Sequence, residues 1–248
     1  MSATLAAQAT GTFRPSFYLW MTLLMAFFVF AGFGMTYFAP LVSGNFPPAP
    51  PVVHLHGIVF STWMILLVVQ AALVNTRNIA LHRSLGTYGI AHATAVLFTG
   101  ALITLLGIQG VNDTYLDPSF LDAMYLSFAA LLGFGLLFTL SLRNTRRPEI
   151  HRRLMLFAIL PLMPPGVNRF FMVPFELDYI PVVPLYLTLD SLALVILIQE
   201  WRSTGQIGKY SMLGAGWIFL QTALHVPVAG SESFLEFCQY LANLAHYR

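Results

Sequence analysis

The chain alternates long apolar segments with short polar connections. Each apolar segment holds about 20 consecutive residues, the length of α-helix that crosses the hydrocarbon core of a bilayer. Because lipid offers no hydrogen-bond partner to the backbone, each segment should be helical. The pattern predicts an all-α integral membrane protein whose seven transmembrane helices cover residues 17–38, 52–74, 85–108, 120–142, 154–173, 182–201 and 210–229.

Two further segments flank this seven-helix domain of residues 17–229. Residues 1–16 form a polar tail. Residues 230–248 begin with a serine cap and an acidic turn, and then place apolar side chains at helical spacing. This pattern predicts an amphipathic helix that lies at the membrane interface. Its apolar positions are Phe234, Phe237, Cys238, Leu241 and Leu244.

The basic residues predict the orientation of the bundle. Ten of them precede the first span or lie in every second loop: Arg14, Arg77, Arg83, Arg143, Arg146, Arg147, Arg152, Arg153, Arg202 and Lys209. Only Arg169 and Arg248 fall on the other side. Since positive loops stay inside, the N-terminus should be cytoplasmic and the C-terminus periplasmic. We expect the arginines that begin the third and fifth spans, in "LHRSLG" and "HRRLM", to contact lipid phosphates.

Composition agrees with a multi-pass membrane protein. Hydrophobic residues make up 57% of the chain and charged residues only 9%, against about 25% charged in soluble domains. The bilayer is therefore one partner. The net charge of +2 gives no ground for nucleic-acid binding, and the single cysteine excludes an intrachain disulfide.

Three histidines share one depth in this arrangement. His54 and His56 begin the second span on the outer side, and His225 ends the seventh there. Residues two apart on a helix point about 200° from each other. His56 recurs with Trp63 and Gln70 every seven residues, so we expect it to face the bundle interior and His54 to face the interface.

Other ionisable residues fall within the spans. The fifth span carries Pro161 and Pro164, which should break it, and a broken helix persists where it is buried or lines a wet cavity. Arg169 follows the break, and Asp190 lies near the middle of the next span. Charge in the hydrocarbon requires a partner. We expect Arg169 and Asp190 to form a structural ion pair or part of a proton path, and His92 is a further candidate for that path.

Imidazoles at one depth can hold a cofactor. His56 and His225 could ligate one haem b, and His54, His56 and His225 could bind a single iron, copper or zinc ion. A retinal protein is excluded because the only lysine, Lys209, lies in a loop. No catalytic residue can be assigned, and the sequence leaves open whether the protein is an enzyme.

A resemblance is carried by "HLHGIVFSTWMILLVVQ", "LHRSLGTYGIAHA" and "RRPEIHRRLMLFAILPLMPPGVNRF". Their HxH, W, Q, LHRxLG and HxRLM pattern resembles an uncharacterised group of bacterial seven-helix inner-membrane proteins. The resemblance implies the seven-helix topology and draws attention to His54, His56, His82 and His151. It implies no reaction.

Three functions remain open. The leading hypothesis is a metal- or haem-binding protein in membrane redox or cofactor-assembly work, which uses the outer histidines. The second is a small-solute or proton-coupled transporter built on the broken span, Arg169 and Asp190. The third is an accessory or scaffold subunit, whose partners would be other membrane-complex subunits or a second copy of the chain.

Overall fold

The computed structural model describes residues 15–109 and 118–246 as helices joined by short connections, without a strand in either range. Six spans are long and apolar enough to cross a membrane, and a bent pair of helices makes a seventh if it counts as one span. The elements are α1 (Phe17–Phe33), η1 (Gly34–Phe38), α2 (Ala39–Val42), α3 (Pro51–Asn75), α4 (Ile79–Gln109), α5 (Pro118–Arg143), α6 (Pro148–Ile159), η2 (Leu160–Leu162), α7 (Pro164–Met172), α8 (Val182–Thr204), α9 (Lys209–Ala229) and α10 (Glu232–His246).

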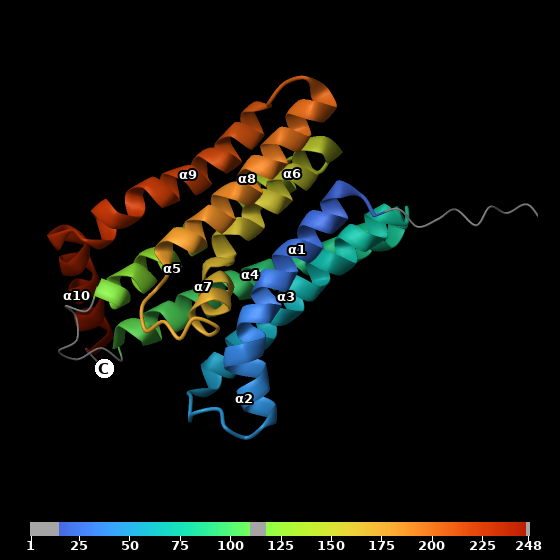
Figure 1. Ribbon diagram of the computed structural model, residues 1–248. Helices are drawn as coiled ribbons and strands as arrows, with labels where there is room; N and C mark the ends of the chain where they lie inside the picture. The colour runs from blue at the N-terminus through green and yellow to red at the C-terminus, as the bar shows by residue number, and fades with distance from the viewer. Residues whose placement is uncertain (1–14, 110–117, 247–248) are drawn as a thin grey trace, which may run out of the picture.

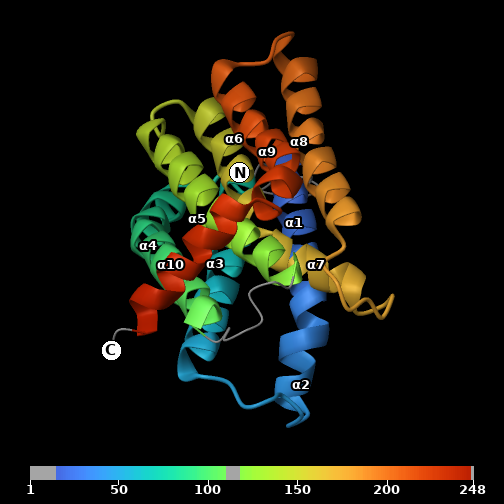
Figure 2. The ribbon, with the colours of Figure 1, turned by 90° about the vertical axis from the view of Figure 1, so that its left-hand side faces the viewer.

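Successive spans run in opposite directions and pack as neighbours (Figure 1). The hairpins α3–α4, α5–α6 and α8–α9 are in contact along their lengths, α1 lies against α7 and α3, and α9 lies against α5, α6 and α8. The second view shows α8 and α9 on one flank of the bundle and α3 and α4 on another (Figure 2). Short connections between antiparallel helices produce this order.

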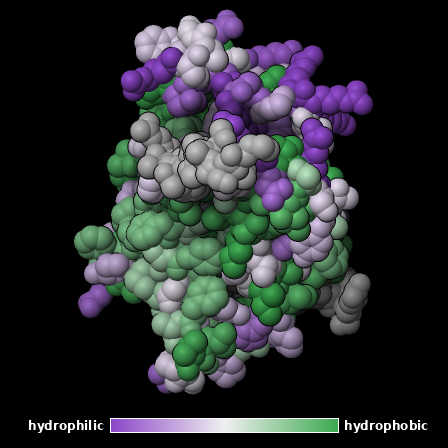
Figure 3. All heavy atoms as spheres, turned by 90° about the vertical axis from the view of Figure 1, so that its right-hand side faces the viewer, coloured by the Kyte–Doolittle hydropathy of each residue, from purple (hydrophilic) through white to green (hydrophobic). Residues whose placement is uncertain are grey.

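Charge divides the two ends of the bundle. We call the end at which α1, α4, α6 and α9 begin the basic end; among the described residues it carries Arg77, Arg83, Arg143, Arg146, Arg147, Arg152, Arg153, Arg202 and Lys209. The opposite, acidic end carries Asp122, Glu176, Asp178, Glu232 and Glu236. Hydrophobic residues cover the middle of the face in Figure 3, and hydrophilic ones gather at its top, where α8 joins α9. This distribution fits a protein embedded in a bilayer.

The fifth predicted span is bent. α6 and α7 meet at 51° around η2, which contains Pro161. Proline cannot donate to the preceding turn, so a single-turn 3₁₀ helix and then a new helix that begins at Pro164 replace the regular ladder. α7 approaches α1 closely: a Cβ at Gly166 would lie 2.7 Å from Cα of Val29. Only glycine permits this contact between two backbones.

The predicted amphipathic segment forms α10, which crosses the acidic end of the bundle (Figure 1). It buries Cys238 and Ala242 against Ile108 of α4 and Met124 of α5. Part of its apolar face therefore packs on protein, while Phe237 and Leu244 remain exposed. Residues 110–117, Asp113 and Asp117 among them, lie outside the described residues.

Candidate functional site

A histidine at the acidic end of α9 is enclosed by ionisable and polar side chains from three helices. His225 is only 1% exposed. Its Nε2 lies 2.9 Å from Oδ1 of Asp122, in the first turns of α5, and its Nδ1 lies 2.7 Å from the hydroxyl of Tyr186 on α8. We call Asp122, Tyr125, Tyr186, Gln221 and His225 the acidic-end network.

Tyr125 fixes the plane of the imidazole. Its ring stacks on His225 with centroids 4.8 Å apart and 17° between the planes. Its hydroxyl donates a 2.7 Å hydrogen bond to the carbonyl oxygen of Gln221, one turn before His225 on α9. The stack and the hydrogen bond tie α5 to α9, and the edge of Tyr186 contacts the same imidazole from α8. The histidine therefore has little freedom to rotate.

The two hydrogen bonds define the tautomer of a neutral imidazole. A carboxylate only accepts, so Nε2 carries the hydrogen and donates to Asp122, while the Tyr186 hydroxyl donates to Nδ1. The side chain of Asp122 is 29% exposed and connects the network to the surroundings of the acidic end. His225 itself has no such exposure.

Polar groups continue one turn deeper along α8 and α9. The amide of Gln221 lies beside Tyr186, yet neither of its polar atoms completes a hydrogen bond of normal geometry within the described residues. The hydroxyl of Thr222 donates a 2.9 Å hydrogen bond to Oδ1 of Asp190. The acidic-end network therefore includes an amide whose donor and acceptor are both available for a further hydrogen bond.

The partner of Asp190 differs from the one expected. Arg169 does not form an ion pair with Asp190 in the described part of the chain. Its guanidinium instead donates to the carbonyl of Pro165 at 2.8 Å and lies 4.8 Å from the ring centre of Phe33. Pro165 lies one turn before Arg169 on α7, so the guanidinium returns to its own helix. Asp190 is satisfied by Thr222.

The histidines at the start of α3 turn to separate neighbours. Nδ1 of His54 lies 3.0 Å from the hydroxyl of Tyr37 in η1, and Nδ1 of His56 lies 3.1 Å from the hydroxyl of Thr99 on α4. His56 also stacks on Phe60. His92, deeper on α4, is 2.8 Å from the carbonyl of Val59 and is buried. The helical spacing thus directs His54 and His56 apart, as expected.

These positions do not gather into a metal site. Within the described residues, no group of three or more His, Cys, Asp or Glu side chains is arranged to hold a metal ion. Both ring nitrogens of His225 are already hydrogen-bonded to Asp122 and Tyr186. Ligation of iron by this imidazole would break one of those bonds. His54, His56 and His225 are therefore not gathered as one three-ligand group in the described structure, and the expected haem or single metal ion stays a prediction.

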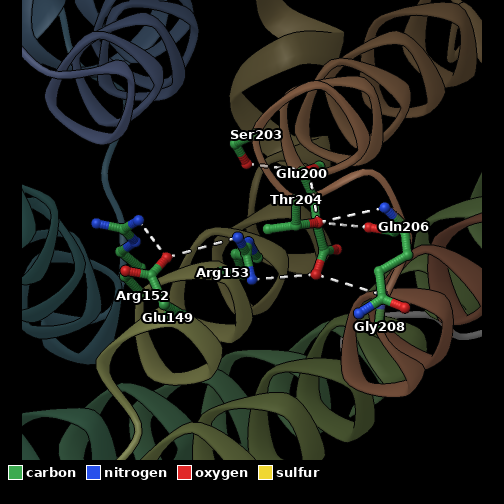
Figure 4. A network of polar contacts seen from close by, with 8 residues as sticks. All are labelled: Glu149, Arg152, Arg153, Glu200, Ser203, Thr204, Gln206 and Gly208. Carbon is green, nitrogen blue, oxygen red and sulfur yellow. Dashed lines mark hydrogen bonds and ion pairs between the residues drawn. The ribbon is translucent and has the colours of Figure 1, made fainter.

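A buried ion pair joins α6 to α8 at the basic end (Figure 4). Nη1 of Arg153 lies 3.0 Å from Oε1 of Glu200, and the two side chains are 7% and 6% exposed. The same carboxylate oxygen accepts from the backbone N–H of Gly208, which caps α9. The expectation that Arg153 contacts lipid phosphate is therefore wrong. The contact between Arg153 and Glu200 was not predicted, because the two residues lie far apart in the chain, on different helices.

Other residues of the quoted motifs meet close to this ion pair. Arg152 pairs with Glu149 and lies over the ring of Tyr18. Nδ1 of His151 lies 2.8 Å from the hydroxyl of Ser141. His82 lies beside the main chain of Gln70 and close enough to His151 for their charges to interact. These contacts join α3, α4, α5 and α6 at the basic end.

Comparisons with known proteins identify no relative. No family model, no curated protein and no solved structure matches the chain. The fold and its apolar surface define a multi-pass α-helical membrane protein. Any narrower function must be argued from the site itself.

Proposed function

We propose that the protein is a proton-coupled membrane carrier in which the acidic-end network binds and releases a proton. The observation that carries the proposal is His225, 1% exposed and held between Asp122 and Tyr186. Ionisable side chains within membrane helices are costly, and they commonly belong to proton or substrate paths. The proposal includes a cytoplasmic membrane with the basic end facing the cytoplasm.

The network can accept a proton without losing a hydrogen bond. A proton that enters past the partly exposed Asp122 converts His225 to an imidazolium, whose Nε2 still donates to the carboxylate. Nδ1 then also carries a hydrogen and donates to the oxygen of Tyr186. The hydroxyl hydrogen of Tyr186 must turn to a new acceptor, and the side chain of Gln221, whose amide oxygen has no hydrogen-bond partner among the described residues, lies beside it. The Asp122–His225 pair changes from one net negative charge to none.

This change in charge acts where α5, α8 and α9 meet. Tyr186 and Asp190 belong to α8, whose other end carries Glu200 in the ion pair with Arg153 of α6. α8 is therefore bonded to α9 and α5 at one end and to α6 at the other. A proton that alters the first contact changes the relative stability of two arrangements of these helices, which is the requirement for coupling.

Two measurements test the proposal. In nanodiscs, ¹⁵N NMR of labelled histidines should show His225 as an Nε2–H tautomer at high pH and as an imidazolium at lower pH. In proteoliposomes with a trapped pH dye, a pH gradient should collapse faster than in empty vesicles. His225→Gln and Asp122→Asn should slow that collapse at least about tenfold, because each removes one step of the relay.

His54→Gln is the matched control. It removes an imidazole from the same end of the bundle but outside the acidic-end network, since His54 contacts Tyr37. The flux should be unchanged. A His225 that keeps one charge state from about pH 5 to 8, together with equal flux in wild type and His225→Gln, would contradict the proposal.

A further inference from the structure

A groove runs along the lipid-facing flank between α1 and α8. α1 packs against α3 and α7, and α8 against α9 and α7, so this flank stays open. Near the basic end a hollow of about 390 Å³ lies between Phe17 of α1 and the last turns of α8. The α8 side is lined by Val195, Gln199, Arg202 and Ser203.

A second hollow continues the first toward the acidic end. Its volume is about 420 Å³, and it lies between Phe28 of α1, Phe171 of α7 and apolar residues of α8 that include Leu187. Val195 lines both hollows, which makes them one groove. From Pro184 to Ser203 the groove follows α8 for about 29 Å at the helical rise of about 1.5 Å per residue. An acyl chain fits this length.

The two ends of the groove differ in chemistry. Apolar side chains line its middle, whereas Arg202 stands at the basic end, exposed and without an ion-pair partner in residues 15–109 and 118–246. An unpaired cation at the end of a largely apolar groove matches the headgroup and the chains of one molecule.

We propose that this α1–α8 groove binds an anionic phospholipid. The phosphate lies against Arg202, and one acyl chain runs past Val195 toward Phe28. Basic pockets between transmembrane helices at the cytoplasmic surface recognise anionic lipids in this way. The site lies on the opposite side of α8 from His225 and does not depend on the proton proposal.

Native mass spectrometry of the detergent-purified protein tests the site. The protein is incubated with phosphatidylglycerol or phosphatidylcholine of identical chains, and retained lipid is counted per chain. Wild type should retain phosphatidylglycerol preferentially. Arg202→Gln should lower its retention about fivefold, the effect of one cation near an anionic headgroup, and should lower the retention of phosphatidylcholine, whose ammonium group offsets its phosphate, by less. Arg143→Gln is the matched control, because Arg143 also ends a helix at the basic end but on α5.

A second variant tests the groove itself. Val195→Trp fills the junction of the two hollows and keeps Arg202, so retention of both lipids should fall at least about threefold. Circular dichroism and size-exclusion chromatography confirm that each variant is folded. The proposal is overturned if wild type retains both lipids equally, if Arg143→Gln acts as strongly as Arg202→Gln, or if Val195→Trp retains lipid as wild type does.

Discussion

Arg153 of α6 and Glu200 of α8 form a 3.0 Å ion pair that is almost completely withdrawn from solvent. Nε of Arg153 and Oε2 of Glu200 are buried without a hydrogen-bond partner in the described structure. Each charge in the pair is stabilised mainly by the other. Loss of one partner should therefore destabilise the fold more than loss of both.

Replacement of either charge alone should destabilise the bundle. We expect Arg153→Gln or Glu200→Gln to lower the free energy of unfolding by about 3–5 kcal/mol, because the first leaves the buried Glu200 without its ion-pair partner and the second leaves Arg153 with only the exposed Glu149. Arg153→Gln combined with Glu200→Gln should cost less than the sum of the two single replacements. Thermal unfolding in detergent measures both. Glu149→Gln is the control: its side chain is 56% exposed, and its ion pairs should contribute little.

The contact between α1 and α7 should not tolerate a side chain. In Gly166→Ala the new methyl group would meet the backbone of Val29, which cannot move aside as a flexible side chain would. We expect a loss of about 3 kcal/mol or more, the upper part of the range for overpacking. Gly216→Ala on α9 has open space around it and should be neutral or slightly stabilising. Equal melting temperatures for the two variants would contradict this packing.

The hydroxyl of Tyr186 should contribute to the stability of the fold through its hydrogen bond to His225. Tyr186→Phe keeps the edge contact with His225 but leaves Nδ1 without its donor, at a cost of about 1–3 kcal/mol. Tyr179→Phe alters an exposed tyrosine and should have no measurable effect. Melting curves at one pH compare the variants, and identical curves would show that the hydrogen bond contributes nothing.

Cys238 should be almost unreactive in the folded protein. It is 0% exposed, and burial raises the pKa of its thiol from 9.0 to about 11. Since only the thiolate is nucleophilic, maleimide labelling should be slow at neutral pH and should accelerate when detergent unfolds the chain. Tyr240→Cys in a Cys238→Ala background places a thiol at a 61% exposed position of α10 and should label at once.

The same pKa shift has a consequence for stability. The neutral thiol is favoured in the fold, so its contribution is complete below about pH 9 and is lost as the pH rises through about 11. Cys238→Ala should therefore weaken the alkaline decline in melting temperature between these values. An unchanged decline would show that the docking of α10 is insensitive to this group.

Purified protein without a histidine tag should contain no stoichiometric iron, copper or zinc. The reason is geometric: His54, His56 and His225 each bind a different neighbour, and the ring nitrogens of His225 are occupied. Elemental analysis per chain decides the matter. About one metal per chain, lost in His56→Ala or His225→Ala, would restore the cofactor hypothesis and displace the proton proposal.

The spans were predictable because bilayer thickness sets their length. The described residues hold six such helices, or seven spans if the bent pair α6–α7 counts as one. Helical periodicity also explains why His54 and His56 diverge. Contacts between helices were not predictable in this way. Asp122 and His225 are 103 residues apart, and the sequence of a helix that is apolar on all sides does not indicate which other helix it contacts. Arg169 and Asp190 were paired in the prediction by their opposite charges alone. In the structure Arg169 donates to the carbonyl of Pro165 on its own helix, and Asp190 accepts from the hydroxyl of Thr222 on α9.

The packing of α10 also sets an order of events during synthesis. Ile108 and Met124 belong to α4 and α5, but the residue that covers them, Cys238, leaves the ribosome only after α9 is complete. Ile108 and Met124 therefore remain without this cover while the helices between α5 and α10 are synthesised and inserted. α10 can close over them only after α9 has been made, and protection of the Cys238 thiol reports that closure.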